Sequence, residues 1–174
     1  ILRKFGVQQR AYFIFVGAIS ARKNLINMIE GFKESGLSKE TKFLLVGFPS
    51  MGSDKIKETI EKHGLRNHVI LADYVEDQCI PVLYRNSIGL AFATLYEGFG
   101  IPIIDAMLSR VPVVYGNLGA APEVGNGLGV AVNPFSIGEI AAGFQELTRA
   151  DNEKIEVAFE YAKTVTWKNT AKKT

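Results

Sequence analysis

Length, composition and charge place the chain among globular proteins of ordinary size. Its 174 residues are 47% hydrophobic and 22% charged, which is enough for one domain with a real core. A net charge of +2 is too small to indicate nucleic acid or an anionic membrane as a partner, and the single cysteine, Cys79, excludes an internal disulfide. We therefore expect one domain over residues 1–174, working in a reducing compartment.

Neither a membrane span nor a targeting segment stands out in the sequence. No apolar run approaches the roughly 20 residues that a transmembrane helix needs, and the sequence does not open on a secretory signal. We expect a cytoplasmic location, with peripheral association with the inner membrane as an option for a full-length protein. Because position 1 is Ile1 and the first methionine is Met28, inside a predicted helix, we expect the chain to be part of a longer protein.

Strands and helices are predicted to alternate along the first half of the chain. Residues 1–11 are mixed and polar and are interpreted as a lead-in or linker. The aromatic and β-branched run Tyr12–Val16 predicts a buried strand that ends at Gly17, and apolar residues at helical spacing predict a helix over 24–34. The same patterns predict a strand at 42–46, a helix at 54–63 capped by Ser53 and followed by Gly64, a strand at 69–71 and a helix at 79–85.

The second half continues this alternation. The patterns predict strands at 87–93, 112–115 and 128–132, a helix at 102–109, a glycine-rich loop at 116–127, a helix capped by Ser136 that runs to 149, a helix from 151 or 152 to 163, and a closing helix over 164–174. Strands that alternate with helices in this rhythm form parallel sheets with right-handed crossovers, so that helices cover both faces. The expected fold is α/β, with a Rossmann-like, doubly wound, mostly parallel six-stranded sheet.

An acidic residue and two glycines stand where the fourth predicted strand turns into a helix. Glu97, Gly98 and Gly100 precede Pro102, which suits the first turn of a helix. In an open α/β sheet such a turn faces the ligand crevice, and the free amide groups at the helix start favour an anion or a polar ligand. Asp105, about one helical turn further on, could contact a second part of the same ligand. The alternative is a plain loop turn in which Asp105 serves the helix dipole.

Two cations follow the first predicted strand. Arg22 and Lys23 precede a helix start, which suits a diphosphate, because Arg binds oxygens in bidentate fashion and Lys supplies a compact charge. A solvated basic turn is the alternative. The loop does not match the dinucleotide fingerprint, because the second and third glycines after Gly17 are lacking, and the sequence contains no P-loop.

Other familiar catalytic and metal-binding patterns do not occur in the sequence. His63 and His68 have no acidic or cysteine companion at metal-ligand spacing, so they are interpreted as surface residues. The acidic loop at 73–77 contains no Asp-x-Asp pair, and no GxSxG nucleophile elbow is present. Cys79 lacks an apparent base and is interpreted as a packing residue. No metal site is predicted.

Six segments, in this order and spacing, resemble the C-terminal half of retaining GT-B glycosyltransferases of the group 1, or family 4, type. They are Phe15-Val16-Gly17 with Arg22-Lys23-Asn24; Leu45-Val46-Gly47; Tyr74-Val75 before Asp77, with Leu83-Tyr84; Tyr96 to Pro102 continuing through Asp105-Ala106-Met107; Pro112-Val113-Val114 with Gly119 to Val124; and Trp167, Thr170 and Ala171. The resemblance implies a metal-independent enzyme that needs no cofactor. It would move a hexose from a nucleoside-diphosphate sugar, such as a UDP- or GDP-hexose, to a glycan or lipid-linked acceptor. It also implies an acceptor domain outside this chain.

The resemblance also implies a role for each matching residue. Lys23 with Arg22 would hold the donor diphosphate and stabilise charge on the leaving nucleotide, and Glu97 would bind the donor sugar. Asp105 would bind the ribose hydroxyls. The remaining expected donor-binding residues are Gly17, Val75 on the base side, and the backbone around Gly98, Phe99, Gly100 and Ile101.

Two positions depart from the family pattern. The family usually has Glu where this chain has Asp105, which shortens the reach of the carboxylate, and many members have Arg where this chain has Ala18. These departures keep a second hypothesis open, a non-catalytic module for sugar-nucleotide binding or assembly. A third hypothesis is a nucleotide-sugar epimerase of related architecture.

Overall fold

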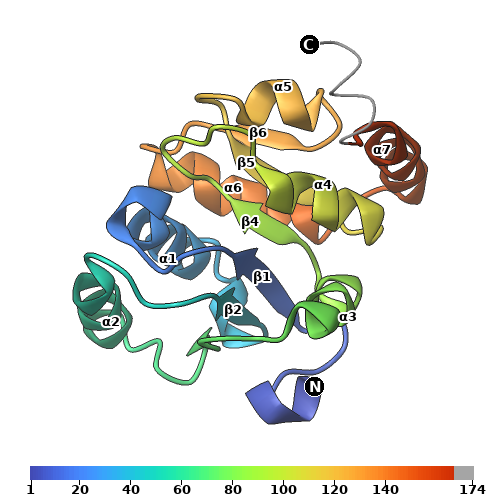
Figure 1. Cartoon of the computed structure of the whole chain (residues 1–174). Coiled ribbons are helices and arrows are strands. Elements are labelled where there is room, and N and C mark those ends of the chain that lie inside the picture. The colour runs from blue at the N-terminus through green and yellow to red at the C-terminus, as the bar shows by residue number, and fades with distance from the viewer. Residues whose placement is uncertain (167–174) are drawn as a thin grey trace.

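A parallel β-sheet runs through the centre of the computed structural model, which describes residues 1–166 (Figure 1). Within this part of the chain the sheet has six strands in the order β3-β2-β1-β4-β5-β6, and every neighbouring pair is parallel. The predicted Rossmann-like fold is thereby confirmed. The strands are β1 (Tyr12–Val16), β2 (Lys42–Val46), β3 (Val69–Leu71), β4 (Leu90–Phe92), β5 (Val113–Gly116) and β6 (Val130–Val132).

Helices cover both faces of the sheet. On one face α1 packs against α2 and α6, and on the other α4 packs against α3, α5 and α7 (Figure 1). None of the helices among the described residues is long and apolar enough to cross a membrane. The α-helices are α1 (Leu25–Glu34), α2 (Ser53–Lys62), α3 (Ile80–Asn86), α4 (Ile101–Leu108), α5 (Ala121–Gly125), α6 (Ile137–Leu147) and α7 (Asn152–Thr164), and short 3-10 helices are η1 (Leu2–Phe5), η2 (Ala21–Lys23), η3 (Leu37–Lys39) and η4 (Asp77–Cys79).

The central strand β1 is buried on both faces because its side chains alternate between two packed layers. On one side, Phe13 meets Phe144 of α6 edge to face, with ring centroids 5.0 Å apart, and also contacts Phe32 of α1. On the other side, the Tyr12 hydroxyl donates a hydrogen bond of 2.5 Å to the carbonyl of Leu83 in α3. Edge-to-face rings add packing energy beyond their buried area.

Several predicted boundaries shift in the structure. Ser136 caps α6 as predicted, and it accepts a backbone N–H. Asp151, predicted only as one of two possible starts of its helix, caps α7 and also accepts a backbone N–H. The predicted cap by Ser53 is wrong. Gly52, with a left-handed φ of 87°, occupies the N-cap position instead, and Ser53 is the first helical residue. The fourth strand is shorter than predicted, and the glycine-rich loop contains the five-residue helix α5, which is too short for a periodic signal.

The predicted lead-in at 1–11 is partly helical and contacts the rest of the fold. Residues 2–5 of the expected lead-in form the 3-10 helix η1, and Arg10 hydrogen-bonds to the backbone of 86–87 at the end of α3. Of the predicted closing helix, Thr164 is the last residue of α7. Positions 167–174, and with them Trp167, lie outside the described residues.

The strand order reverses direction between β1 and β4. From β1 the chain proceeds through α1 toward β2, whereas from β4 it proceeds through α4, on the other face, toward β5. The loops after β1 and β4 therefore diverge and leave a crevice at the carboxyl ends of these strands. This switch point positions the candidate site.

Candidate functional site

The loops after β1 and β2 form one wall of the crevice. They pair through their backbones, with Gly17 N donating to Val46 O and Ile19 N donating to Phe48 O, both at 2.9 Å. Gly47 is pressed against the carbonyl of Gly17, so that a Cβ at position 47 would collide with that oxygen. The close backbone packing fixes the position of Gly17, one of the predicted donor-binding residues.

Lys23 and Glu97 meet across the switch point. Lys23 Nζ lies 2.6 Å from Glu97 Oε1, and each side chain is only 11% exposed. The ammonium group also lies 5.8 Å from the ring centroid of Phe92, which is itself stacked on Phe15. The fold thus brings together two charged residues that are 74 positions apart in the sequence. A small ligand at this point would contact both.

Asn24 holds this arrangement in place, although no role for it was predicted. Its backbone is left-handed (φ 59°), a conformation that asparagine tolerates better than most residues. Its buried side-chain amide donates to the carbonyl of Ala93 at 2.8 Å and to that of Pro134 at 2.7 Å. Asn24 therefore ties the loop after β1 to the ends of β4 and β6. The local signal was an asparagine directly after the two cations, just before a helix.

The loop after β4 presents free backbone amides at the start of α4. Gly100 is the N-cap with φ 98°, and its carbonyl accepts from Ile103 N at 2.9 Å. Gly98 has open space where a Cβ would stand, with no heavy atom within 4 Å. Phe99 and Ile101 are exposed beside it. The first amides of a helix lack partners within the helix, so this backbone can hold an anion or a hydroxyl.

A groove of about 730 Å³ extends from Gly17 to the loop after β3 and the start of α3. Gly17, Val75 and Asp105, three of the predicted donor-binding residues, all line it. Burial raises the pKa of the Asp105 carboxyl above its ordinary value. Among the described residues no side chain or backbone group forms a hydrogen bond or ion pair with this carboxylate. A polar ligand in the groove would supply the missing partner.

An aromatic pair stands at the rim of the groove. Phe48 and Tyr74 stack with ring centroids 5.2 Å apart and an angle of 18° between the rings, and both rings line the groove. They remain 62% and 55% exposed, so their contact covers only part of each ring. Phe48 was not predicted as a site residue, because its partner follows a different strand.

One predicted residue stands apart from these contacts. Arg22 is exposed in η2, next to Lys23, and its side chain makes no hydrogen bond or ion pair with residues 1–166. Within the same range, no three His, Cys, Asp or Glu side chains lie close enough to hold a metal ion. A second cavity of about 320 Å³ lies at the amino ends of β5 and β6, beneath the connection from α6 to α7. None of the predicted site residues lines that cavity.

Comparison with known proteins identifies the family. The sequence model of the family described as Glycosyl transferases group 1 matches residues 2–165. O-antigen chain mannosyltransferase B from Escherichia coli is similar over 97% of this chain and 46% of its own length, with 26% identical residues. The chain thus spans about half the length of this curated relative.

Solved structures share the fold. A glycosyltransferase from Rickettsia africae ESF-5 covers 92% of this chain and 45% of its own, with a TM-score of 0.79 and 22% identity. Anabaena Alr3699/HepE in complex with UDP and glucose covers 92% of this chain and 46% of its own, with a TM-score of 0.72 and 23% identity. The family match over nearly the whole sequence confirms the predicted resemblance, and the chain belongs to the group 1 glycosyl transferases.

Proposed function

We propose that this chain is the donor-binding half of a glycosyltransferase that moves a hexose from a nucleoside-diphosphate sugar to a glycan or lipid-linked acceptor. The observation that carries the proposal is the contact between Lys23 and Glu97. The Lys23 side chain lies beside Gly17, and Gly17 lines the groove that also contains Asp105. A cation, a carboxylate and a second carboxylate along one crevice match a donor made of a diphosphate, a hexose and a ribose. The acceptor would be bound by a further domain of a longer protein.

The charges of the site suit the bond that has to break. Cleavage of a glycosyl–phosphate bond develops negative charge on the departing diphosphate and positive charge on the sugar. Lys23, Arg22 and the amides from Gly98 to Ile101 would supply positive potential to the diphosphate, and such preorganised groups stabilise developing charge. We propose that these groups suffice without a metal ion, and that the reaction retains the anomeric configuration, as the family resemblance implies.

The remaining donor contacts follow the length of the groove. Glu97 would accept hydrogen bonds from the hexose once the diphosphate draws Lys23 away from it. Asp105 would accept from the ribose hydroxyls, and the base would lie at Val75, next to the rim formed by Phe48 and Tyr74. The names of the relatives supply the first donors to try. They are GDP-mannose, because of the Escherichia coli mannosyltransferase, and UDP-glucose, because HepE was solved with UDP and glucose.

Titration calorimetry on the 174-residue chain tests the proposal directly. UDP, GDP, UDP-glucose and GDP-mannose are each titrated. Either UDP and UDP-glucose or GDP and GDP-mannose are expected to bind. At 100 times its Kd a ligand stabilises the folded state by roughly 2.7 kcal/mol, a rise in Tm of about 5–11 °C for a chain of this size. A folded chain that binds none of the four contradicts the proposal.

Transfer separates the enzyme from a non-catalytic binding module. In a longer protein that contains this chain, Lys23→Ala is expected to reduce sugar transfer at least tenfold, about 1.4 kcal/mol of transition-state stabilisation. Donor binding without any transfer, in wild type and variant alike, would favour the binding or assembly module. Sugar interconversion in the absence of an acceptor would favour the epimerase.

A further inference from the structure

The hydroxyl of Tyr84 is a buried polar group without a partner. Tyr84 belongs to α3, is 1% exposed and lines the groove. Among residues 1–166 its hydroxyl and Thr94 Oγ1 are the buried side-chain oxygens that lack a hydrogen bond. Tyr12, which packs against the same helix, shows the ordinary arrangement, because its hydroxyl is bonded to Leu83 O. Most buried polar groups are paired, so the unpaired hydroxyl of Tyr84 calls for an explanation.

Tyr84 and Asp105 line the same groove, and the helices that carry them, α3 and α4, pack against each other. Burial, and after it the negative charge of Asp105, raise the pKa of Tyr84 well above its usual range. Both residues line the groove, and Asp105 also lacks a hydrogen-bond partner in the described part of the chain. Two unpaired groups, one a donor and the other an acceptor, thus lie together at the place proposed for the ribose. An unpaired buried group destabilises the free protein, and a ligand that completes the bonding removes that penalty.

The accessibility of the two groups decides which of them touches the ligand. The Tyr84 hydroxyl exposes less than 1 Å² to solvent, whereas Asp105 is only partly buried. A ligand therefore reaches the carboxylate first. An ionised carboxylate has about four acceptor sites, which is enough for one tyrosine hydroxyl and a sugar diol together.

We propose that Tyr84 is a positioning residue for ribose recognition: when the donor binds, its hydroxyl donates a hydrogen bond to the Asp105 carboxylate. The carboxylate is then oriented so that its remaining lone pairs accept from the ribose hydroxyls. This inference rests on the proposed function.

The substitution Tyr84→Phe tests the role, with Tyr12→Phe as its matched control. Phenylalanine at 84 removes only an unpaired hydroxyl, so the Tm of the free protein is expected to stay the same or rise, whereas Tyr12→Phe lowers it. Affinity is then measured by calorimetry for UDP and GDP and for their 2′-deoxy and 3′-deoxy analogues. Tyr84→Phe is expected to weaken binding of the ribonucleotide about tenfold, the value of a hydrogen bond to a charged group. The deoxy analogues are expected to lose less, so that discrimination between ribose and deoxyribose falls.

A double variant shows whether the hydroxyl acts through the carboxylate. Asp105→Asn combined with Tyr84→Phe is expected to bind no more weakly than Asp105→Asn alone. Unchanged ribose discrimination in Tyr84→Phe, or additive losses in the double variant, would overturn the inference and leave the proposed function standing. A Tm that falls as in Tyr12→Phe would mark a purely structural residue and overturn it too. If wild type binds no nucleotide at all, the proposed function fails and the inference falls with it.

Discussion

At the scale of single residues, the charges of Lys23 and Glu97 stabilise each other in the free protein, and the same two charges are proposed to bind the donor. Each group is largely removed from water and each is compensated by the other. A donor that takes Lys23 for its diphosphate and Glu97 for its sugar replaces one set of partners by another. The site therefore needs both charges even when no donor is bound.

Loss of either charge is expected to destabilise the free chain. Lys23→Met or Glu97→Leu leaves the other charge buried without a partner, and breaking a buried pair in this way costs about 3 kcal/mol. The double variant is expected to lose much less than the sum, because no unpaired charge remains. Urea unfolding of the four proteins measures the coupling. Strictly additive losses would show that the two charges do not depend on each other.

The Asp105 carboxylate is expected to lower the stability of the folded protein when no ligand is bound. Burial raises the pKa of its folded carboxyl above the ordinary value of 3.8, so the folded protein holds this proton more tightly than the unfolded chain does. Ionisation of Asp105 therefore lowers the free energy of unfolding. This loss is absent below pH 3.8, develops as the pH rises from there through the folded pKa, and is complete above the folded pKa. Asp105→Asn is therefore expected to be more stable than wild type at pH 7, by a margin that shrinks toward pH 4. Thermal unfolding across this range measures it, and a margin independent of pH would contradict the argument.

At the scale of elements, the turn into α4 combines one glycine required by the backbone with another that is not. Gly100 has a left-handed φ of 98°, and its added Cβ would lie 3.2 Å from Ile103 Cδ1. The backbone at Gly98 is not left-handed, and its added Cβ would meet no atom of the described chain. The backbone conformation therefore explains Gly100, whereas Gly98 keeps open a space that a ligand could use.

Alanine at the two positions is expected to have opposite effects. Gly100→Ala forces an alanine into a left-handed conformation, which costs about 1–2 kcal/mol. Gly98→Ala leaves the Tm of the free chain unchanged, but its methyl group projects into the space proposed for the donor. Affinity for the nucleotide sugar is then expected to fall at least tenfold. Calorimetry and thermal unfolding of both variants decide the matter, and full donor affinity in Gly98→Ala would place the donor elsewhere.

Local signals predicted elements better than they predicted contacts. Ser136 was predicted as a cap because a cap bonds within three residues of itself, and the buried strand β1 was predicted from a short run of aromatic and β-branched residues. The predicted cap by Ser53 was wrong because Gly52 takes the N-cap position. Gly52 lies where the loops after β1 and β2 pair, so close to Ala21 that an added Cβ would lie 3.0 Å from the Ala21 Cβ. The contributions of Asn24 and of the Phe48 and Tyr74 pair depend on partners from other strands, which no local pattern reveals.

At the scale of the whole molecule, the strand order decides where the site lies. The sequence predicted parallel strands and the loops after them, but not which strands are neighbours. Only the order β3-β2-β1-β4-β5-β6 places the loop that carries Lys23 beside the loop that carries Glu97. Sequence motifs therefore predicted the residues of the site, whereas the contact between them is seen only in the fold.

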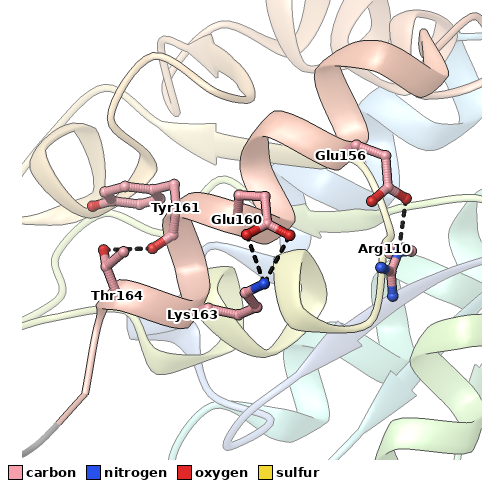
Figure 2. A network of polar contacts seen from close by, with 6 residues as sticks. All are labelled: Arg110, Glu156, Glu160, Tyr161, Lys163 and Thr164. Carbon is pink, nitrogen blue, oxygen red and sulfur yellow. Dashed lines mark hydrogen bonds and ion pairs between the residues drawn. The ribbon is translucent and has the colours of Figure 1, made fainter.

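The helix α7 packs against α4, and Arg110, two residues after the end of α4, forms an ion pair with Glu156 of α7 (Figure 2). The Arg110 side chain lies 2.6 Å from Glu156 Oε1 and stacks on the ring of Phe159, 3.6 Å from its centroid. Glu160 and Lys163 pair further along α7, on the same helix. Arg110 thus joins the turn after α4 to two successive turns of α7, and we expect its loss to lower the stability of the whole fold.

Replacement of Arg110 is expected to separate charge from stacking. The ion pair is half exposed, so it contributes at most about 1 kcal/mol, and an exposed cation–π contact adds about 0.5–1 kcal/mol. Arg110→Ala is therefore expected to lower the free energy of unfolding by about 1–2 kcal/mol. Arg110→Lys keeps the charge but loses the planar stacking group, and is expected to recover less than half of that loss. Urea unfolding at low and high salt distinguishes the two parts, because salt weakens the ion pair while the packing of the guanidinium on the ring persists. Wild-type stability in Arg110→Ala would mean that apolar packing alone holds α7 on α4.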